Sequence, residues 1–256
     1  MQALQDFITN CYNELISSTE EEVIFARQYL QSRSLSPQTI NKHQIGYCSS
    51  NITIPPEVNY YGSKDKSKEY HYFIRRRLVV PIYGEFGNIV GLATRRPVST
   101  PGNTWWNLSF KKGNHLFLLD KARKSIFDSN KIYLVEGYVD ALILYQEGLK
   151  SVCAIMGTAL TPRKVGLIAR YCNNVCLCLD VDKNNAGQKA QNKAIRILSE
   201  FGFCESFSVI DNIPQGEDPD VFVIKNGIKE FLNRERKLNE EEVKAIRKQV
   251  QVEERS

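Results

Sequence analysis

The chain has 256 residues, of which 42% are hydrophobic and 25% are charged, and its formal net charge is +5. These proportions are typical of globular proteins and exclude a disordered or fibrous chain. No apolar stretch reaches the roughly 20 residues that a bilayer-spanning helix needs, and the N-terminus lacks the basic start and apolar run of a secretory signal. We therefore expect a cytoplasmic protein that has no membrane partner.

The seven cysteines are odd in number and lie mostly in apolar contexts, which favours reduced thiols over a disulfide framework. Three of them, Cys172, Cys176 and Cys178, are close in sequence. No Cys-x-x-Cys pair is present, and zinc sites usually contain one. We interpret these cysteines as small buried hydrophobes and expect no zinc.

The first predicted elements are helices. Residues 19–32 carry a helical pattern, with Thr19 as the expected N-cap and Glu22 completing a capping box. Ser36 and Pro37 then predict the start of a short second helix that runs to about His43, since proline suits the first helical position.

A β-hairpin follows. Two apolar runs, residues 78–83 and 88–94, flank the turn sequence GEFG, and Pro81 is expected at an edge or a bulge because it has no N–H to donate. Basic residues 75–77 lead into the hairpin and residues 95–96 lead out of it. Antiparallel pairing would bring these two basic ends together.

Charge is distributed unevenly along the chain. Residues 61–130 hold thirteen Lys and Arg against five Asp and Glu, whereas residues 131–226 hold ten against eleven. Residues 103–113, which include two tryptophans and two lysines, are predicted to form a loop within the basic part. Basic charge beside clustered carboxylates is what a site that processes a polyanion would need. On charge alone, a solvated basic face is an equal alternative.

From Lys131 onward, apolar strands alternate with helices of about a dozen residues. This pattern predicts an α/β fold whose parallel sheet is covered by helices on both faces. The tail from about Gly227 is predicted to be helical and highly charged. The expected strands are residues 131–135, 151–157, 174–180 and 206–210, and the expected helices are residues 138–148, 161–172 and 185–202.

Acidic residues follow three of these strands. Glu136 comes directly after one strand, Asp180 and Asp182 end a second, and a Glu-Asp-Pro-Asp segment with Asp218 and Asp220 follows a third. The carboxyl ends of parallel strands meet at one edge of a sheet, and clustered carboxylates repel unless a cation neutralises them. Oxygen ligands alone favour Mg²⁺ or Mn²⁺, so we predict a metal site for phosphoryl chemistry.

Six stretches, in order along the chain, resemble one known family. They are FARQYLQSRSLSPQTINKHQIGY, RRRLVVPIYGEFGNIVGLATRR, KKGNHLFLLDKAR, LVEGYVDAL, CLCLDVDKNNAGQKA and QGEDPD. The last three resemble the TOPRIM module, and IMGTALT between them resembles a segment of bacterial DnaG-type primases. Together the six resemble the DnaG-type primase catalytic core over about residues 20–226.

The resemblance implies a nucleotidyltransferase that makes short RNA primers on a single-stranded DNA template from ribonucleoside triphosphates, with two or more Mg²⁺ or Mn²⁺ ions. It implies three subdivisions: a basic primase-core subdomain at 1–115, a TOPRIM catalytic subdomain at 116–226 and a charged helical segment at 227–256. The residues that match the family's metal-binding acids are Glu136, Asp180, Asp182, Asp218 and Asp220, of which the first three are the expected catalytic residues.

Arg77, Arg95 and Asn107 match positions that handle the template and the incoming nucleotide in the family. We add their basic neighbours as candidates for nucleic-acid or nucleotide binding: Arg75, Arg76, Arg96, Lys111 and Lys112. The family's lysine shortly before Asn107 is absent here, because Thr104 or Trp105 stands in its place. Either Lys111 or Lys112 replaces it, or nucleotide binding is altered.

The family's N-terminal zinc-binding domain and most or all of its helicase-binding domain have no counterpart in these residues. We therefore expect a replicative helicase or another targeting protein as partner, as in a bacterial, phage or mobile-element protein. Two alternatives stay open: a TOPRIM-type metal-dependent nuclease, and a non-catalytic nucleic-acid-binding adaptor. The basic subdomain argues against the first, and the complete acidic set argues against the second.

Overall fold

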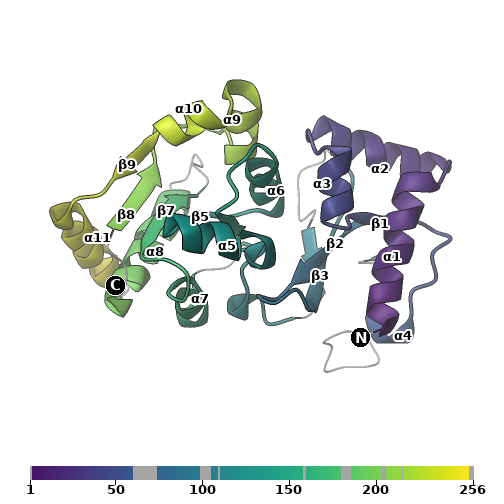
Figure 1. The fold of residues 1–256 in the computed structure, drawn as a ribbon, viewed down its shortest axis with the longest axis horizontal. Coiled ribbons are helices and arrows are strands. Elements are labelled where there is room, and N and C mark those ends of the chain that lie inside the picture. The colour runs from purple at the N-terminus through teal and green to yellow at the C-terminus, as the bar shows by residue number, and fades with distance from the viewer. Residues whose placement is uncertain are drawn as a thin grey trace. The chain divides into compact units, whose positions relative to one another are not determined.

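A computed structural model describes residues 2–59, 74–98, 105–108, 110–157, 160–179, 186–202, 206–214 and 216–253. The chain forms two compact units, Met1–Phe110 and Lys111–Ser256. Each contains its own β-sheet (Figure 1) and its own hydrophobic core. None of the helices in the described residues combines the length and apolar character that crossing a bilayer requires.

The first unit begins with a helix that packs on its sheet. Helix α1 (Gln2–Ser17) buries residues three or four positions apart, which is the spacing of one helical face. It lies so close to strand β1 (Gly46–Cys48) that a Cβ added to Gly46 would be 2.5 Å from the backbone carbon of Cys11. Glycine at this position therefore permits the close contact between helix and strand. The α1 residues in the core are Leu4, Phe7, Ile8 and Cys11.

The predicted cap of the second helix is wrong, whereas the third helix is confirmed. Helix α2 (Glu21–Ser32) has Glu20 at its N-cap, without a side-chain cap, so Thr19 and Glu22 form no capping box. Glu22 instead contacts Ser50 and Arg76. Helix α3 (Pro37–Lys42) is capped by the Ser36 hydroxyl, which accepts a hydrogen bond from the backbone N–H of Thr39. A short helix, α4 (Pro56–Asn59), follows β1.

The hairpin is confirmed as β2 (Arg77–Tyr83) paired antiparallel with β3 (Ile89–Arg95), within a sheet of order β1-β2-β3-β4. Pro81 lies beyond the three residues of β2 that pair with β1, next to a register shift at Ile82 and Tyr83, as the missing N–H requires. The loop predicted around the tryptophans is wrong there, because β4 (Trp105–Asn107) pairs with the end of β3.

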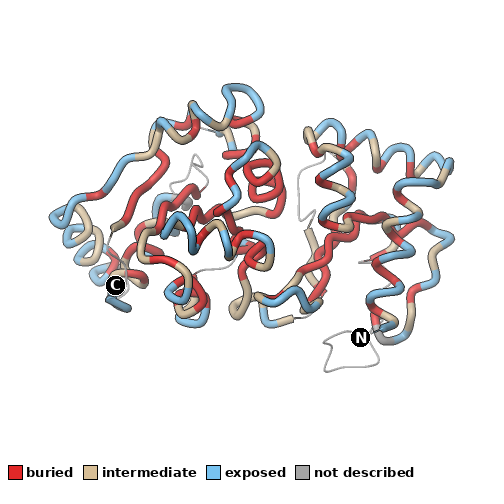
Figure 2. The backbone as a smooth tube through the Cα atoms, in the orientation of Figure 1, coloured by how far each residue is buried: buried red, intermediate tan, exposed pale blue. Residues whose placement is uncertain are grey.

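The second unit contains the predicted parallel sheet, in the order β6-β5-β7-β8-β9. Strand β7 is central between β5 and β8, and all four residues after its first are buried, as they are in β5 and β8 (Figure 2). The parallel strands are β5 (Lys131–Val135), β6 (Val152–Ala154), β7 (Asn174–Cys178) and β8 (Ser206–Ile210).

Helices cover this sheet and complete the α/β fold. One core lies between the sheet and α5, α7 and α8, where alternate residues of β5 and β7 point toward these helices. The bounds are α5 (Leu119–Ser129), α6 (Tyr138–Gln146), α7 (Pro162–Ile168), α8 (Ala186–Phe201) and α9 (Pro219–Asn226), with a short 3-10 turn, η2 (Lys112–Asn114), before α5. Thr161 caps α7, as the sequence predicts.

The cysteines in the described residues are buried and free, which confirms their interpretation as small hydrophobes for Cys11, Cys48, Cys153, Cys172, Cys176 and Cys178. Cys204 lies outside the described residues. Burial raises the pKa of the Cys153 thiol well above its usual value, because a thiolate would be poorly solvated there. These thiols therefore act in packing.

The tail is only partly helical, which corrects the sequence prediction. Helix α10 (Ile228–Asn233) leads into β9 (Glu235–Lys237), which pairs antiparallel with β8, and α11 (Glu240–Glu253) then packs on α8. The Glu235 carboxylate forms an ion pair with Lys131 and accepts a hydrogen bond from the Tyr133 hydroxyl at 2.9 Å. These contacts tie the tail to β5.

Candidate functional site

Glu136 lies at the carboxyl end of β5, half-buried. Val135 pairs with Cys178 in the parallel register, so the chain leaves β5 and β7 at the same edge of the sheet. The backbone carbonyl of Glu136 accepts a hydrogen bond from the N–H of Gly157, which follows β6 and has a positive φ of 63°. Asp180 and Asp182, predicted to follow β7, lie outside the described residues.

The carboxylate of Asp140 joins two of the acidic segments. Asp140 is the third residue of α6 and is buried. Its Oδ2 accepts a hydrogen bond from the backbone N–H of Gly137 at 3.2 Å, and its Oδ1 accepts one from the N–H of Asp220 at 3.4 Å. One side chain therefore holds the turn after Glu136 against the N-terminus of α9.

Sequence reasoning missed Asp140, although a signal was present. An acidic residue at the third position of a helix, three residues after its N-cap, is the pattern of a capping box, and the contact with Gly137 has this form. A Cβ at Gly137 would lie 2.4 Å from Asp140 Oδ2. The Asp140 carboxylate therefore leaves no room for a Cβ at this position, although the backbone, with a φ of −100°, would accept any residue.

The acids near α9 differ in exposure. Asp218 is the N-cap of α9 and is exposed, whereas Asp220 is only 3% exposed. The Asp220 Oδ1 accepts a hydrogen bond from the N–H of Val221 at 2.8 Å. Asp218 is thus accessible at this end of the helix, while Asp220 is packed beneath it.

The donors at this edge fit a hard divalent cation by their chemistry. They are carboxylate oxygens, which Mg²⁺ and Mn²⁺ prefer, and Glu136 and Asp218 both retain solvent exposure. Among the described residues, no group of three or more His, Cys, Asp or Glu is close enough together to hold a metal ion. A complete ligand set would thus draw on Asp180 and Asp182.

A buried lysine supports the same edge and was also missed. Lys164 is fully buried, and its Nζ donates a hydrogen bond to the carbonyl of Ile155 at 2.7 Å. The N–H of Ile155 in turn donates to the carbonyl of Val135, directly before Glu136. Burial and, to a smaller extent, the positive charge of Lys112 together lower the pKa of Lys164 to about 8.

The basic candidates of the first unit differ in exposure: Arg77 is buried, Arg75 and Arg95 are half-buried, and Arg76 and Arg96 are exposed. Arg77 is 4% exposed, and its Nε donates to the Thr94 hydroxyl at 3.1 Å. Arg95 bonds to the Tyr29 hydroxyl, and its guanidinium lies 5.2 Å from the centre of the Trp105 ring. These two arginines are built into the sheet and its surroundings.

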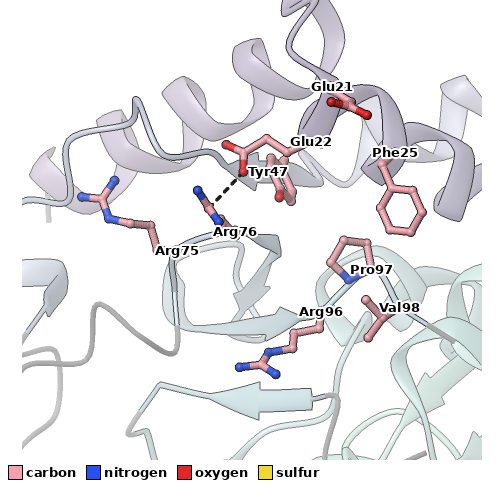
Figure 3. Close-up of a pocket in the computed structure, with 9 residues that line it drawn as sticks. All are labelled: Glu21, Glu22, Phe25, Tyr47, Arg75, Arg76, Arg96, Pro97 and Val98. Carbon is pink, nitrogen blue, oxygen red and sulfur yellow. Dashed lines mark ion pairs between the residues drawn. The ribbon is translucent and has the colours of Figure 1, made fainter. Parts of the chain in front are cut away.

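The remaining arginines of the hairpin ends line one cavity, as the predicted pairing requires. Arg75, Arg76 and Arg96 border a cavity of about 720 Å³ in the first unit (Figure 3). The other three polar candidates do not line this cavity. Asn107 is half-buried in β4 of the same unit. The second unit contains Lys111, which is exposed, and Lys112, which is half-buried at the start of η2.

Comparison with known proteins divides the chain between two family models. Residues 11–123 match the family "DNA primase catalytic core, N-terminal domain", and residues 133–223 match the family "Toprim-like". The DNA primase of Aquifex aeolicus is 32% identical over 244 residues, which cover 90% of this chain and 47% of that protein. The DNA primase of Clostridium acetobutylicum is 32% identical over 81% of this chain and 36% of its own length.

Solved structures show the same similarity. The Aquifex aeolicus primase, solved with its zinc-binding and RNA polymerase domains, has a TM-score of 0.76 and 29% identity, over 92% of this chain and 60% of that one. A DnaG primase catalytic domain bound to ssDNA has a TM-score of 0.69 and 25% identity, over 91% and 80%.

The chain spans half or less of the length of these two curated relatives. The similarity nonetheless runs through both of its units, and the two family models follow each other without overlap. The acidic edge lies in the Toprim-like part, and the arginine-lined cavity lies in the part that matches the primase core. The chain therefore belongs to the DnaG-type primase family, within the region of the catalytic core.

Proposed function

We propose that the chain synthesises short RNA primers on single-stranded DNA by metal-assisted nucleotidyl transfer. The observation that supports this most directly is the acidic edge of the parallel sheet, where Asp140 ties the turn after Glu136 to the segment of Asp218 and Asp220. An edge of this kind, in a chain whose relatives are named DNA primases, favours phosphoryl chemistry over a purely structural role.

The family implies a divalent metal, and we propose Mg²⁺ or Mn²⁺ rather than zinc because the candidate ligands are carboxylates. Glu136, Asp180, Asp182, Asp218 and Asp220 would hold the ions, of which Asp220 is buried near the start of α9. Bound divalent ions neutralise phosphate charge and make a hydroxyl a better nucleophile. Asp140 acts as a positioning residue, since its carboxylate is already engaged by two backbone N–H groups.

The basic part of the first unit would bind the template. Arginine side chains bind phosphates through several donors in a fixed plane, and Arg75, Arg76 and Arg96 meet at one cavity. We include Arg77, Arg95, Asn107, Lys111 and Lys112 as further residues for the template or the incoming ribonucleoside triphosphate. A related catalytic domain has been solved with ssDNA, which supports a single strand as the template.

A replicative helicase or another targeting protein is the proposed partner of this primase core. This part of the proposal is tested by adding candidate helicases to the assay below. We expect a partner to raise the yield of primers without changing which metal is required.

The test is a template-directed assay with the purified chain, a single-stranded DNA template, labelled ribonucleoside triphosphates and one divalent metal at a time. We expect short RNA products with Mg²⁺ or Mn²⁺ and none with EDTA. Parallel reactions with labelled DNA or RNA strands and no nucleotides test for a nuclease. Strand cleavage without synthesis would replace the proposed function with that of a nuclease.

A further inference from the structure

The cavity beside the hairpin ends has features that template binding by charge alone does not explain. Its volume of about 720 Å³ is within the range of small-molecule sites. Figure 3 shows Arg76 and Arg96 on one side and an apolar group, Phe25, Pro97 and Val98, on the other. A surface that only attracted phosphate would need no apolar side.

The apolar side presents an aromatic ring to solvent. Phe25 is on α2 and is 50% exposed, whereas neighbouring residues of the same helix, Val23 and Ala26, are fully buried. Phe25 therefore contributes little to the core of the first unit. Its ring is available to stack against a planar ligand group.

The charged side is organised before any ligand arrives. The Nε of Arg76 donates to the Ser50 hydroxyl at 3.0 Å and lies 3.2 Å from the Glu22 carboxylate. Glu22 is itself held, because its other oxygen accepts a hydrogen bond from the N–H of Ser50 at 2.8 Å. The backbone of Arg76 lies in the left-handed region, with a φ of 54°, which the same contacts support.

This arrangement leaves the outer part of the Arg76 guanidinium accessible. Both contacts described for this side chain are made through Nε, and 72% of the side chain is exposed. The terminal nitrogens, which form the fork that recognises phosphate, therefore face solvent beside Arg96, which is also exposed. Glu22 contacts Arg76 at Nε and so holds the orientation of a side chain that stays mostly exposed.

Planar apolar contact on one side and guanidinium groups on the other match the two halves of a nucleotide. We propose that this cavity binds one nucleotide unit, with its base stacked on Phe25 and its phosphate bound by Arg76 and Arg96. The proposal rests on the proposed function, since it assigns a specific stacking position to the surface that would bind the template. The nucleotide is either part of a single strand or a free nucleoside triphosphate, and the two sources are separated below.

The experiment measures binding of the full chain to a fluorescently labelled oligo(dT) by anisotropy, in EDTA and at several salt concentrations. We expect Phe25→Ala to weaken binding about tenfold, the effect of losing one base stack, while the slope of affinity against salt stays as in the unsubstituted chain. Arg96→Ala should weaken binding and also reduce that slope by about one. The matched control is Phe86→Ala, since Phe86 is 73% exposed in the same unit but does not line the cavity.

Competition then identifies the source of the nucleotide. If unlabelled oligo(dT) competes and ATP at millimolar concentration does not, the site binds a strand. If ATP competes in the unsubstituted chain but not in Phe25→Ala, it binds a free nucleotide. Unchanged affinity for both ligands in Phe25→Ala would overturn the proposal. So would an equal loss in Phe86→Ala.

Failure here is distinguishable from failure of the proposed function, because binding is measured without metal and primer synthesis is measured separately. A chain that synthesises primers but binds strands equally well with or without Phe25 retains the function and loses this site. Circular dichroism of Phe25→Ala checks its fold, which should be retained because Phe25 is 50% exposed. If Phe25→Ala does not fold, Phe25→Leu takes its place, since leucine keeps apolar bulk without an aromatic face. Weaker strand binding by folded Phe25→Leu supports stacking, and unchanged binding contradicts it.

Discussion

The two units of the chain differ in how their strands pair and in the charge of the side chains that gather at the strand ends. The first unit pairs its strands antiparallel and gathers arginines where the ends of one hairpin meet. The second unit pairs its main strands in parallel and gathers carboxylates where several strands end. In an antiparallel hairpin, residues close in sequence become neighbours, whereas a parallel edge assembles residues from distant segments. The arginines of the basic surface are therefore close together in the sequence, whereas the acids of the acidic edge come from distant segments.

The largest expected effect comes from removing an acid. Glu136→Ala and Asp180→Ala should each abolish primer synthesis, by about a hundredfold or more, because the carboxylates of the second unit would hold the metal. Strand binding in EDTA, which depends on the first unit, should change little. The measurement is labelled primer yield beside anisotropy with the same template.

The control for these variants is Asp128→Ala, which removes an exposed carboxylate of α5 that pairs with Lys124. Its primer yield should equal that of the unsubstituted chain. If either acid variant kept full synthesis, the division of labour between the two units would be wrong.

The next effect is on stability. Gly137→Ala should lower the free energy of unfolding by about 1–3 kcal/mol, because its Cβ would lie 2.4 Å from Asp140 Oδ2 and push apart the two acidic segments. Gly166→Ala in α7 should instead raise it by about 0.5–1 kcal/mol, since nothing lies within 4 Å of the added carbon. Urea unfolding measures the free energy of unfolding of both variants. If both substitutions changed it in the same direction, Asp140 would not be what excludes a side chain at Gly137.

A smaller effect is expected from the basic side. Arg76→Ala should weaken strand binding several-fold, about 1 kcal/mol for one lost charged hydrogen-bonding group at an exposed site. The folded stability should change little, because the Arg76 side chain is mostly exposed. Lys124→Ala, which removes a cation 83% exposed on α5, is the control and should leave binding unchanged. A larger loss of stability than of binding would assign Arg76 a structural role.

The smallest effect is a change with pH. The pKa of Lys164 is lowered to about 8 by burial and by Lys112, below the ordinary lysine value near 10.4. Between these two values the unfolded chain binds more protons than the folded chain, so stability from this group rises with pH in that window. Unfolding by urea at pH 7.5 and 9.5 should show this rise in the unsubstituted chain and a smaller one in Lys164→Met. An identical pH dependence in both would exclude Lys164 as its source.

Much of the second unit follows from its sequence alone. Apolar runs of about five residues, separated by helices of about a dozen, leave few arrangements besides a parallel sheet. The same pattern places Glu136 at a strand end, and the resemblance of its motifs to the TOPRIM module adds the family. Local signals worked where they were strong, as at Ser36 and Thr161, whose hydroxyls cap their helices.

Other features were decided only by the tertiary structure. Thr19 and Glu22 match a capping box in sequence, yet Glu22 binds Ser50 and Arg76 instead, because folding brings β1 and the hairpin next to α2. Strand β9 has a charged sequence with little strand propensity. It is stabilised by antiparallel pairing with the edge of β8 and by the ion pair between Glu235 and Lys131. Folding likewise brings Asp140 next to Asp220 and places Phe25 in the cavity that the arginines line.

Local sequence patterns were thus sufficient to predict the fold class and the order of most elements, and they supply the acids that we propose as metal ligands. Tertiary structure decided which side chains meet: Asp140 with Asp220, Glu22 with Arg76, and Phe25 with an arginine-lined cavity. The physical reason is that periodicity and turn propensity are properties of neighbouring residues, whereas these contacts depend on the three-dimensional packing of segments that are distant along the chain.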